Sequence, residues 1–249
     1  MSEVRVATFN IRNGRALDGR HAWPFRRRRA AAAIDELGAD VVGLQEVYRF
    51  QERSLLRRLP RYRSLGAGRT DGRRGERNPI LYDPDAVTPV TWETRWYGAD
   101  DGRPGTRLPG ARFPRIATLA VLATPSGAAF QVACTHLDAR SADRRRRSLE
   151  QLSGWLDPAL PRVVLGDLNA EPGDHELAPL VAAGLRNALP AGAGGTNHDF
   201  SGRLDGRRID HIFVSGAVEV AAARVAHPRP GGRLPSDHWP VVAELRQPG

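Results

Sequence analysis

The sequence predicts an α+β protein in which β-sheets pack face to face and helices cover their outer sides. Short apolar or alternating segments, typical of strands, are interleaved with a few amphipathic helical segments. Several neighbouring strand-like segments are also close enough in the chain to pair as hairpins, which indicates antiparallel pairing and not a purely parallel sheet. The clearest pair is residues 115–123 and 128–135, which flank the turn-forming sequence Thr-Pro-Ser-Gly.

The first half of the chain begins with a strand and an amphipathic helix. Residues 4–11 alternate between apolar and polar side chains, which predicts a strand. Residues 25–37 carry alanine and arginine at helical period and end at Gly38, a residue type that commonly follows a helix. We expect further strands at residues 40–44, 79–82 and 87–96, and a short helix at residues 54–59.

Strands continue through the second half, interrupted by two helices. Residues 141–156 have helical periodicity, with Ser141 as the expected N-cap, and a second helix is expected at about residues 175–183. We expect the remaining strands at residues 162–165, 209–214, 218–225 and 240–246. The segments 98–110 and 191–202 are rich in Gly, Pro and Asp, and we expect them to be loops at the rim of a site.

The composition is that of one globular domain, residues 1–249, without a membrane span. No apolar run approaches the roughly 18 residues that a spanning helix needs. The N-terminus lacks the basic, apolar and small-residue zones of a secretory signal, so we expect a cytoplasmic protein. We also expect a monomer, since no obligate protein partner is evident from the sequence. Cys134 is the one cysteine, which excludes an intramolecular disulfide; we interpret it as a small buried side chain, not a nucleophile.

The net charge is +9, and all 37 basic residues are arginine. Arginine suits phosphate oxygens and favours an anionic substrate, but the absence of lysine is equally consistent with codon bias. The arginine runs at residues 26–29 and 144–147 each open a predicted helix, and we interpret them as solvated helix faces. Charge alone therefore gives limited support for phosphate chemistry.

Polar residues that can act as ligands recur where apolar strands end. The apolar run 163–165 breaks at Gly166 and is followed by Asp167 and Asn169. Because residues i and i+2 of an extended segment face the same way, these two side chains could converge on one reacting group, as a base and its orienting partner. A strand followed by a polar turn would look the same in isolation. The same design recurs at residues 8–12, 44–47, 134–138 and 236–240.

Taken in chain order, seven short motifs resemble those of the endonuclease/exonuclease/phosphatase superfamily of divalent-metal phosphoesterases. They are TFNIRNG, LQEV, ERNPILYD, THLD, GDLNAEP, RIDHIF and SDHWPV, and they cover nearly the whole chain. The resemblance implies a four-layer αββα sandwich: two mixed, mostly antiparallel β-sheets face to face, with helices outside and the site at one end.

The resemblance also implies a divalent cation, Mg²⁺ or Mn²⁺. Hydrolysis of a phosphate ester brings water to an anion, and a hard cation stabilises charge on the attacking and leaving oxygens. Mg²⁺ prefers oxygen ligands and keeps several waters, so few protein ligands are needed. Glu46 is the best candidate, and by resemblance Asn10 and Asp237 complete or border the metal site. The histidines do not fall in compact ligand spacings, so we do not expect a zinc site.

By resemblance, four residues form the catalytic centre. Asp167 orients and deprotonates the attacking water, and Asn169 holds that water or a phosphate oxygen. His238 faces the scissile phosphate and donates hydrogen bonds to its oxygens. Asp210 holds His238 in its tautomer and orientation.

His136 helps to choose among branches of the family. Its motif, Thr-His-Leu-Asp, resembles the branch of deoxyribonuclease I-like nucleases, deadenylases, sphingomyelinases and inositol phosphatases, and differs from the tyrosine motif usual in abasic-site endonucleases. Glu76 aligns with the carboxylate that pairs with this histidine in the deoxyribonuclease-like members. Such a pair is expected to raise the pKa of the imidazole, so that His136 could act as an acid toward the leaving oxygen.

Several further residues are candidates for substrate contact. By resemblance either Arg112 or Arg115 meets a phosphate, and Asn78 belongs to the same group of candidates. Thr196 and His198 are candidates for the rim of the site. For the histidines in loops or at helix starts we expect surface positions, with His211 directed toward the opposite face of its sheet; these are His21, His175, His198, His211 and His227.

The motifs predict a phosphoesterase that cleaves P–O bonds by metal-assisted, in-line attack of water. A nuclease acting on DNA or RNA is favoured by the net charge. A phosphatase or phosphodiesterase acting on a small ester, such as an inositol phosphate or a phospholipid headgroup, explains the motifs equally well. A non-catalytic binding module is disfavoured, because such a protein is expected to lose the base or the metal carboxylate and this chain retains Glu46, Asp167, Asn169, Asp210, Asp237 and His238.

Overall fold

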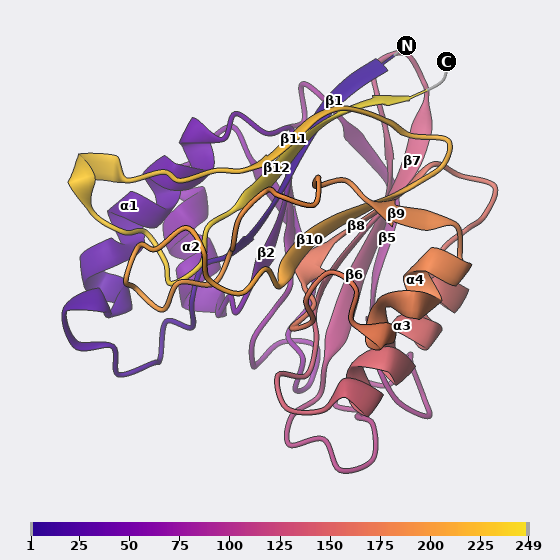
Figure 1. Cartoon of the computed structure of the whole chain (residues 1–249), viewed down its shortest axis with the longest axis horizontal. Coiled ribbons are helices and arrows are strands. Elements are labelled where there is room, and N and C mark those ends of the chain that lie inside the picture. Colours follow the sequence, from indigo (N-terminus) through magenta and orange to yellow (C-terminus); the bar gives the residue numbers. More distant parts are fainter. Residues whose placement is uncertain (1, 248–249) are drawn as a thin grey trace.

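The computed structural model describes residues 2–247, which form two six-stranded sheets packed face to face. Helices α1 and α2 lie on the outer side of one sheet, and α3 and α4 lie on the outer side of the other (Figure 1). The strand orders are β11-β12-β1-β2-β4-β3 and β5-β6-β7-β8-β10-β9. The predicted four-layer αββα sandwich of mixed, mostly antiparallel sheets is confirmed.

The first sheet is built from both ends of the chain. Its strands are β1 (Ser2–Asn10), β2 (Val41–Gln45), β3 (Arg63–Leu65), β4 (Ile80–Tyr82), β11 (Glu219–Val225) and β12 (Val241–Gln247). The helices that cover it are α1 (Trp23–Glu36) and α2 (Arg49–Leu56). The short 3₁₀ turns η1 (Gly19–His21) and η3 (Pro230–Gly232) lie against α1.

The second sheet comes from the middle of the chain. Its strands are β5 (Thr88–Trp96), β6 (Ile116–Ala123), β7 (Ala129–His136), β8 (Arg162–Asp167), β9 (Leu185–Asn187) and β10 (Asp210–Ser215). The helices are α3 (Ala142–Trp155) and α4 (Ala178–Ala182), the latter preceded by η2 (His175–Leu177). The predicted cap of α3 is present, since Ser141 Oγ accepts a hydrogen bond of 3.2 Å from the Arg144 backbone N–H.

Two parallel strand pairs determine where functional side chains gather. Within residues 2–247, β1 with β2 and β7 with β8 are the parallel neighbours, and all other pairs are antiparallel. Parallel strands end at the same edge of a sheet. Asn10 is therefore opposite Gln45, next to Glu46, and His136 is opposite Asp167.

The two sheets come close together at Gly43. A Cβ atom at this glycine would lie 2.9 Å from both Cys134 Sγ and Leu165 Cβ, which belong to the other sheet. The apolar layer between the sheets includes Val41, Cys134 and Leu165, all fully buried. Cys134 is a buried residue as predicted, and burial raises the pKa of its thiol to about 12.

Several local predictions need correction. The helix predicted at residues 54–59 is α2, which begins five residues earlier, at Arg49, where Gln51 Oε1 accepts from the Tyr48 backbone N–H at 3.1 Å. The three-residue strands β3 and β9 were not predicted, because each contains a single apolar residue, whereas the equally short β4 is apolar throughout and was predicted. The helix predicted near residues 175–183 is a 3₁₀ turn followed by a short α-helix.

The arginine runs are not simply solvated faces. Arg26 is fully buried, and its guanidinium donates to four backbone oxygens: those of His21 at 2.8 Å, Arg12 at 2.7 Å, Pro235 at 3.4 Å, and Ile11. It therefore clamps the segment that follows β1. In the second run, Arg144 pairs with Asp138 and Arg145 with Glu176, so these charges are compensated within the protein, while Arg27 and Arg28 are exposed as predicted.

No helix among residues 2–247 is both long enough and apolar enough to cross a lipid bilayer.

We predict that Gly43→Val lowers the free energy of unfolding by about 1–3 kcal/mol, because the new side chain overlaps atoms of the opposite sheet. Urea denaturation followed by circular dichroism measures the change. Gly154→Ala in α3 is the matched control, since no atom lies within 4 Å of its Cβ position, and alanine in a helix is expected to be neutral or stabilising. Equal stability of the two variants would contradict close contact of the sheets at Gly43.

Candidate active site

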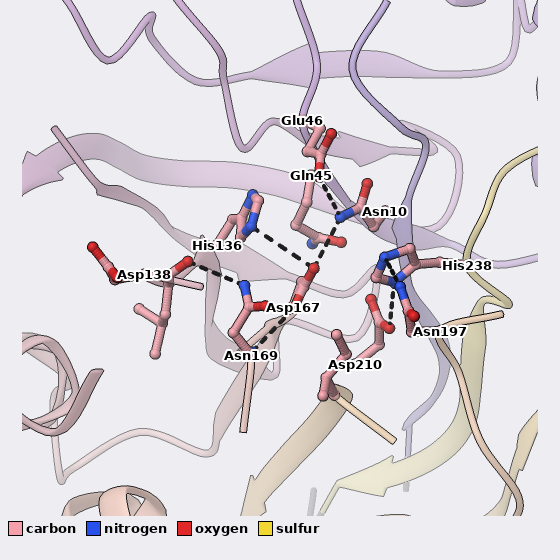
Figure 2. A network of polar contacts seen from close by, with 12 residues as sticks. Asn10, Gln45, Glu46, His136, Asp138, Asp167, Asn169, Asn197, Asp210 and His238 are labelled. Atoms are coloured by element: carbon pink, nitrogen blue, oxygen red, sulfur yellow. Dashed lines mark hydrogen bonds and ion pairs between the residues drawn. The ribbon is translucent and has the colours of Figure 1, made fainter. Parts of the chain in front are cut away.

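A cavity of about 530 Å³ opens at the end of the sandwich where β1, β2, β7 and β8 finish. Both sheets and the loops around them contribute to its walls. Its lining residues are Arg12, Asn13, Ala16, Glu46, Arg69, Glu76, Phe113, Arg115, His136, Ala139, Asp167, Asn169, Asn197, Asp199, Ile209, Asp237 and His238. Most of the residues predicted for catalysis therefore face one space (Figure 2).

Asn10 connects carboxylates from the two sheets. Its side-chain Nδ2 donates to Glu46 Oε1 at 3.1 Å and to Asp167 Oδ2 at 2.9 Å (Figure 2). Its Oδ1 accepts from the Arg12 backbone N–H at 2.9 Å. Because its nitrogen faces the carboxylates, Asn10 orients both Glu46 and Asp167.

Glu46 and Asp237 approach the cavity from different segments, and each is held by the chain that follows β1. Glu46 Oε2 accepts from the Asn13 backbone N–H at 2.7 Å. Asp237 Oδ2 lies 3.2 Å from the guanidinium of Arg12, which in turn donates to both oxygens of Asp18. Hydrogen bonds to Asp18 raise the pKa of Arg12 further, so its charge beside Asp237 is permanent.

The carboxylates of Glu46 and Asp237 both line the cavity, and their oxygens fit a hard divalent cation. In a neighbouring group, Asp167, Asp210 and His238 each offer a donor atom within 4.8 Å of the others, and Asp210 Oδ1 is buried without a hydrogen-bond partner among the described residues. Burial and the nearby Asp210 raise the pKa of Asp167 to about 7, and burial with Glu46 raises the pKa of Asp237. Crowded, buried carboxylates of this kind are stabilised by a cation held through oxygen ligands.

His238 is held between Asp210 and Asn197. Its Nδ1 lies 2.7 Å from Asp210 Oδ2, and its Nε2 lies 2.9 Å from the side-chain amide of Asn197 (Figure 2). Burial alone would lower the pKa of His238, but the carboxylates of Asp210, Asp237 and Asp167 outweigh it and raise that pKa well above the usual value. The amide of Asn197 can satisfy Nε2 in either protonation state, since it presents a donor or an acceptor.

Glu76 and His136 do not form the predicted pair. Glu76 Oε2 lies 2.6 Å from the guanidinium of Arg69, and its Oε1 accepts from Asn13 Nδ2 at 3.0 Å. Burial together with Arg115 and Arg69 lowers the pKa of His136 well below its usual value, opposite to the expected direction. The imidazole is therefore neutral; its Nε2 lies 3.8 Å from Asp167 Oδ2, and its buried Nδ1 has no partner among the described residues.

Asn169 does not continue the strand as predicted. Its φ is 52°, a left-handed conformation, so the alternation of an extended strand does not apply. Instead the Asn169 backbone N–H donates to Asp167 Oδ1 at 3.0 Å, and its Nδ2 donates to the carbonyl oxygen of Leu137 at 3.2 Å. The turn itself brings Asn169 to the cavity and fixes the Asp167 carboxylate.

The structure separates the two arginine candidates. Arg115 lines the cavity, and one of its guanidinium nitrogens lies 3.4 Å from the carbonyl oxygen of His136. Burial and the neighbouring Arg69 lower the pKa of Arg115. Arg112 is exposed, with its guanidinium over the Phe113 ring, and is not part of the cavity wall.

Three candidates for substrate contact have structural partners instead. Asn78 Nδ2 donates to the carbonyl oxygen of Ile116 at 2.8 Å. Thr196 Oγ1 accepts from the backbone N–H groups of Ile209 and Asp210, at 3.0 and 3.1 Å. His198 packs against Trp239, with ring centroids 4.3 Å apart. None of Asn78, Thr196 and His198 lines the described cavity.

Two histidines expected at the surface are buried. One is His198, whose Nδ1 accepts from the Gly202 backbone N–H at 3.2 Å. The other is His211, whose Nδ1 accepts from Asn187 Nδ2 at 2.8 Å and whose Nε2 lies 2.8 Å from the carbonyl oxygen of Ala170. Hydrogen bonds to neighbouring segments explain why these polar rings are tolerated in the interior.

Sequence reasoning missed several residues of the cavity, above all Arg12, Arg69 and Asn197. Arg12 lies inside the first motif, and Asn197 lies between Thr196 and His198, so both were adjacent to named candidates. Backbone strain is a further sign of function: the non-glycine residues with positive φ among the described residues are Arg12, Glu46, Asn169, Asp199 and Phe200. The first four of these line the cavity.

Comparisons with known proteins agree with this geometry. The profile of the Endonuclease/Exonuclease/phosphatase family matches residues 7–238. The crystal structure of an endonuclease/exonuclease/phosphatase from Bacteroides vulgatus is 31% identical over 100% of both chains, with a TM-score of 0.92. No curated protein sequence matches the chain.

Two further structures resemble the chain over nearly its whole length. A mannosyl-6-phosphatase from Bacteroides thetaiotaomicron is 26% identical, covering 98% of this chain and 99% of the other, with a TM-score of 0.89. TDP2 from D. rerio, complexed with a single strand DNA product, is 16% identical, covering 99% of this chain and 100% of the other, with a TM-score of 0.76. At that identity the TDP2 likeness shows the fold alone.

We predict that Asp167→Asn stabilises the protein when divalent cations are removed. Burial and Asp210 raise the pKa of Asp167 from 3.8 to about 7, so between these values the folded state holds a proton that the unfolded state has released. The stability contributed by this group therefore falls as pH rises through that window. In EDTA, urea denaturation should find the variant more stable than the wild type by about 1–3 kcal/mol near about pH 8, with a smaller difference near about pH 5. A variant that is no more stable at the higher pH would contradict the electrostatic conflict at Asp167.

Proposed function

The chain belongs to the endonuclease/exonuclease/phosphatase family, and from this premise we propose that it is a divalent-metal-dependent phosphoester hydrolase. Members of this family are phosphoester hydrolases. The observation that carries the proposal is the convergence of Glu46, Asp167 and His238 on one open cavity, with the buried Asp210 holding His238 from behind. A binding module without catalysis would not need this combination of buried carboxylates and an oriented imidazole.

The cation of the proposal is Mg²⁺ or Mn²⁺. Glu46 and Asp237 would hold it, and Asn10 would fix the position of Glu46 through its hydrogen bond of 3.1 Å. When bound, the cation supplies charge neutralisation for the phosphate and its leaving oxygen. Oxygen donors dominate this part of the cavity, which favours a hard cation over zinc.

In the proposed reaction Asp167 accepts the proton of the attacking water. Its carboxylate is fixed by Asn10 Nδ2 on one oxygen and the Asn169 backbone N–H on the other, so each oxygen keeps acceptor capacity for a water molecule. A pKa raised to about 7 by burial and Asp210 makes the carboxylate basic enough to take a proton near neutral pH. Asn169 lines the same cavity and would contact the water or a phosphate oxygen.

Three other side chains would bind the phosphate oxygens. His238, whose pKa is raised by the surrounding carboxylates despite burial, would carry a proton and donate through Nε2 in place of its contact with Asn197. Arg115 adds a guanidinium to the cavity wall. His136 is neutral, since burial lowers its pKa, so in this proposal it donates a hydrogen bond and does not protonate the leaving group. His238 is then the better proton donor.

We predict that the purified protein hydrolyses a phosphoester with Mg²⁺ or Mn²⁺, and that EDTA or Asp167→Ala abolishes turnover. The loss should reach at least about a thousandfold in kcat, because the base acts in the transition state. The Asp167→Ala sample, purified identically, also measures contamination. His136→Gln, which retains a neutral hydrogen-bond donor, should keep more activity than Asp167→Ala. Comparable turnover in Asp167→Ala and wild type would remove Asp167 as the base.

A groove beside the cavity favours a nucleic-acid substrate. It has a volume of about 650 Å³ and shares Arg69 and Phe113 with the cavity. The exposed ring of Phe50 lies in its wall, and Tyr48 carries the guanidinium of Arg15 at 4.5 Å from its ring centroid. Arginine beside exposed aromatic rings suits the backbone phosphates and bases of a single strand.

Four of the six arginines of this groove are available to a ligand. Within residues 2–247, no carboxylate lies within 4 Å of the guanidinium nitrogens of Arg15, Arg49, Arg53 or Arg73. We therefore favour cleavage of DNA or RNA. The second candidate is a small phosphoester, which is supported by the 26% identity to a mannosyl-6-phosphatase.

If the substrate is a nucleic acid, we predict that Arg49→Gln/Arg53→Gln raises KM for a single-stranded oligonucleotide by about tenfold and reduces the salt dependence of binding, since both side chains line the groove. Arg27→Gln/Arg28→Gln, which removes two exposed charges from α1, is the control and should leave KM unchanged. Activity on small phosphoesters without cleavage of oligonucleotides would decide for the second candidate.

A further inference from the structure

A second cavity, of about 440 Å³, lies beside the first and is lined mainly by arginine. Arg20 and His21 come from η1, Arg29 from α1, Arg229 from the segment before η3, and Arg233 from the segment after it. The segment that includes η3 returns to α1 near the C-terminal end of the sequence, in yellow in Figure 1. We call this cavity the arginine pocket. Its lining contains no carboxylate.

The guanidinium groups of the arginine pocket are uncompensated. Among the described residues, no carboxylate oxygen lies within 4 Å of Arg20, Arg29, Arg229 or Arg233, whereas nearby Arg203 pairs with Asp205 at 2.8 Å. Arg29 Nε is buried and has no hydrogen-bond partner in this part of the chain. The partners that these guanidinium groups have are uncharged: Arg20 donates to His21 Nε2 at 3.1 Å, and Arg229 donates to the Gly202 carbonyl oxygen at 2.8 Å.

The positive charges of the pocket act on one another. Burial and Arg233 lower the pKa of Arg29, and burial with Arg20 and Arg29 lowers the pKa of His21. Crowding of like charges costs free energy, which an anion in the pocket would recover. The planar fork of arginine matches phosphate oxygens in particular. The stacked rings of His21 and Phe200, 4.3 Å between centroids, give the pocket a fixed wall.

The arginine pocket and the catalytic cavity share one wall. Asp199 lines the catalytic cavity and the next residue, Phe200, lines the arginine pocket. Both have left-handed φ values, 46° and 56°, which turn successive side chains to different sides. The Asp199 backbone N–H donates to the carbonyl oxygen of Asp237 at 3.1 Å, so the shared wall at residues 199–200 is attached to a residue of the catalytic cavity.

We propose that the arginine pocket is a second anion-binding site, which takes a phosphate or diphosphate group other than the one positioned for hydrolysis. The group has two sources with the same chemistry: a further phosphate of the substrate itself, or a free phosphate compound. The wall that the arginine pocket shares with the catalytic cavity favours the first source, because one substrate could then reach both cavities. Only that assignment rests on the proposed hydrolase activity; the binding of the anion does not.

The binding test uses inorganic pyrophosphate and the whole protein in EDTA. Isothermal titration calorimetry should show that Arg29→Gln/Arg233→Gln weakens one class of pyrophosphate sites by at least about tenfold. Arg27→Gln/Arg28→Gln removes the same number of charges, both from α1, without touching the pocket and should bind as the wild type does. Thermal denaturation of both variants checks that folding is retained.

A second readout reports on the pocket directly. Because the imidazole of His21 lines it, pyrophosphate should shift the NMR resonances of His21 in the wild type and in the control, but not in Arg29→Gln/Arg233→Gln. Unchanged affinity in that variant, or an equal loss in the control, would overturn the proposal, because binding would then be elsewhere or would follow net charge alone.

Kinetics separates the two sources. If the pocket holds a substrate phosphate, Arg29→Gln/Arg233→Gln raises KM about tenfold for an oligonucleotide and leaves KM for bis(p-nitrophenyl) phosphate, which has one phosphate, unchanged. If it holds a free anion, KM for both substrates stays unchanged and only the response to added pyrophosphate is lost. Should the protein hydrolyse neither substrate, the hydrolase proposal fails, while the calorimetry and NMR still decide whether the pocket binds an anion.

Discussion

The catalytic cavity depends on one buried amide. Asn10 Nδ2 donates to Glu46, which follows β2 of the first sheet, and to Asp167, which ends β8 of the second sheet. A single planar amide therefore bridges two carboxylates from opposite sheets and sets their separation. Gly43 supports this close approach, because its missing side chain leaves room for Cys134 and Leu165 of the opposite sheet. Arg26, buried beneath the segment after β1, donates to the carbonyl oxygens of residues that immediately follow Asn10 and keeps that segment in place. The contacts that pack the two sheets together therefore also fix the positions of the side chains around the cavity.

The charges around this bridge are only partly balanced within the protein. Arg12 faces Asp237 and Arg69 faces Glu76. Asp167 and Asp210, in contrast, lie opposite each other on neighbouring strands, and the imidazole of His238 contacts Asp210 at 2.7 Å. Burying carboxylates so close together lowers stability unless they are protonated or meet a cation. The surplus of negative charge inside the cavity and the unpaired arginines around it complement a metal ion and the phosphate oxygens that it would accompany. The unbalanced carboxylates therefore lower the stability of the folded protein at the place where the proposed cation and phosphate would bind.

The sequence was sufficient for the layers of the fold and for the strand ends that carry the motifs, because apolar periodicity and parallel pairing place those residues at one edge. It was insufficient where the outcome depends on a loop. Thr196 and His198 were predicted to line the site, but the residue between them, Asn197, faces the cavity instead. In an irregular segment the direction of each side chain depends on its contacts, here with β10 and Trp239, and no sequence periodicity encodes them. Glu76 meets Arg69 because the backbone of the segment between them folds back on itself, with the Arg69 N–H donating to the Glu76 carbonyl at 3.0 Å. That closure also leaves His136 without its expected carboxylate.

Backbone strain gives an independent reason to assign function to this end of the molecule. Glu46 follows β2 with a φ of 62°, a conformation in which glycine would cost less. Only with a side chain, however, can this position present a carboxylate to Asn10 and to the Asn13 backbone N–H. Arg12 and Asn169 adopt similar conformations, each following a strand that has just delivered a polar residue to the cavity. Glycine at each of these positions would remove the backbone strain and would be expected to make the fold more stable. Side chains that point toward one cavity stand there instead, which indicates that their direction serves a function that offsets the strain.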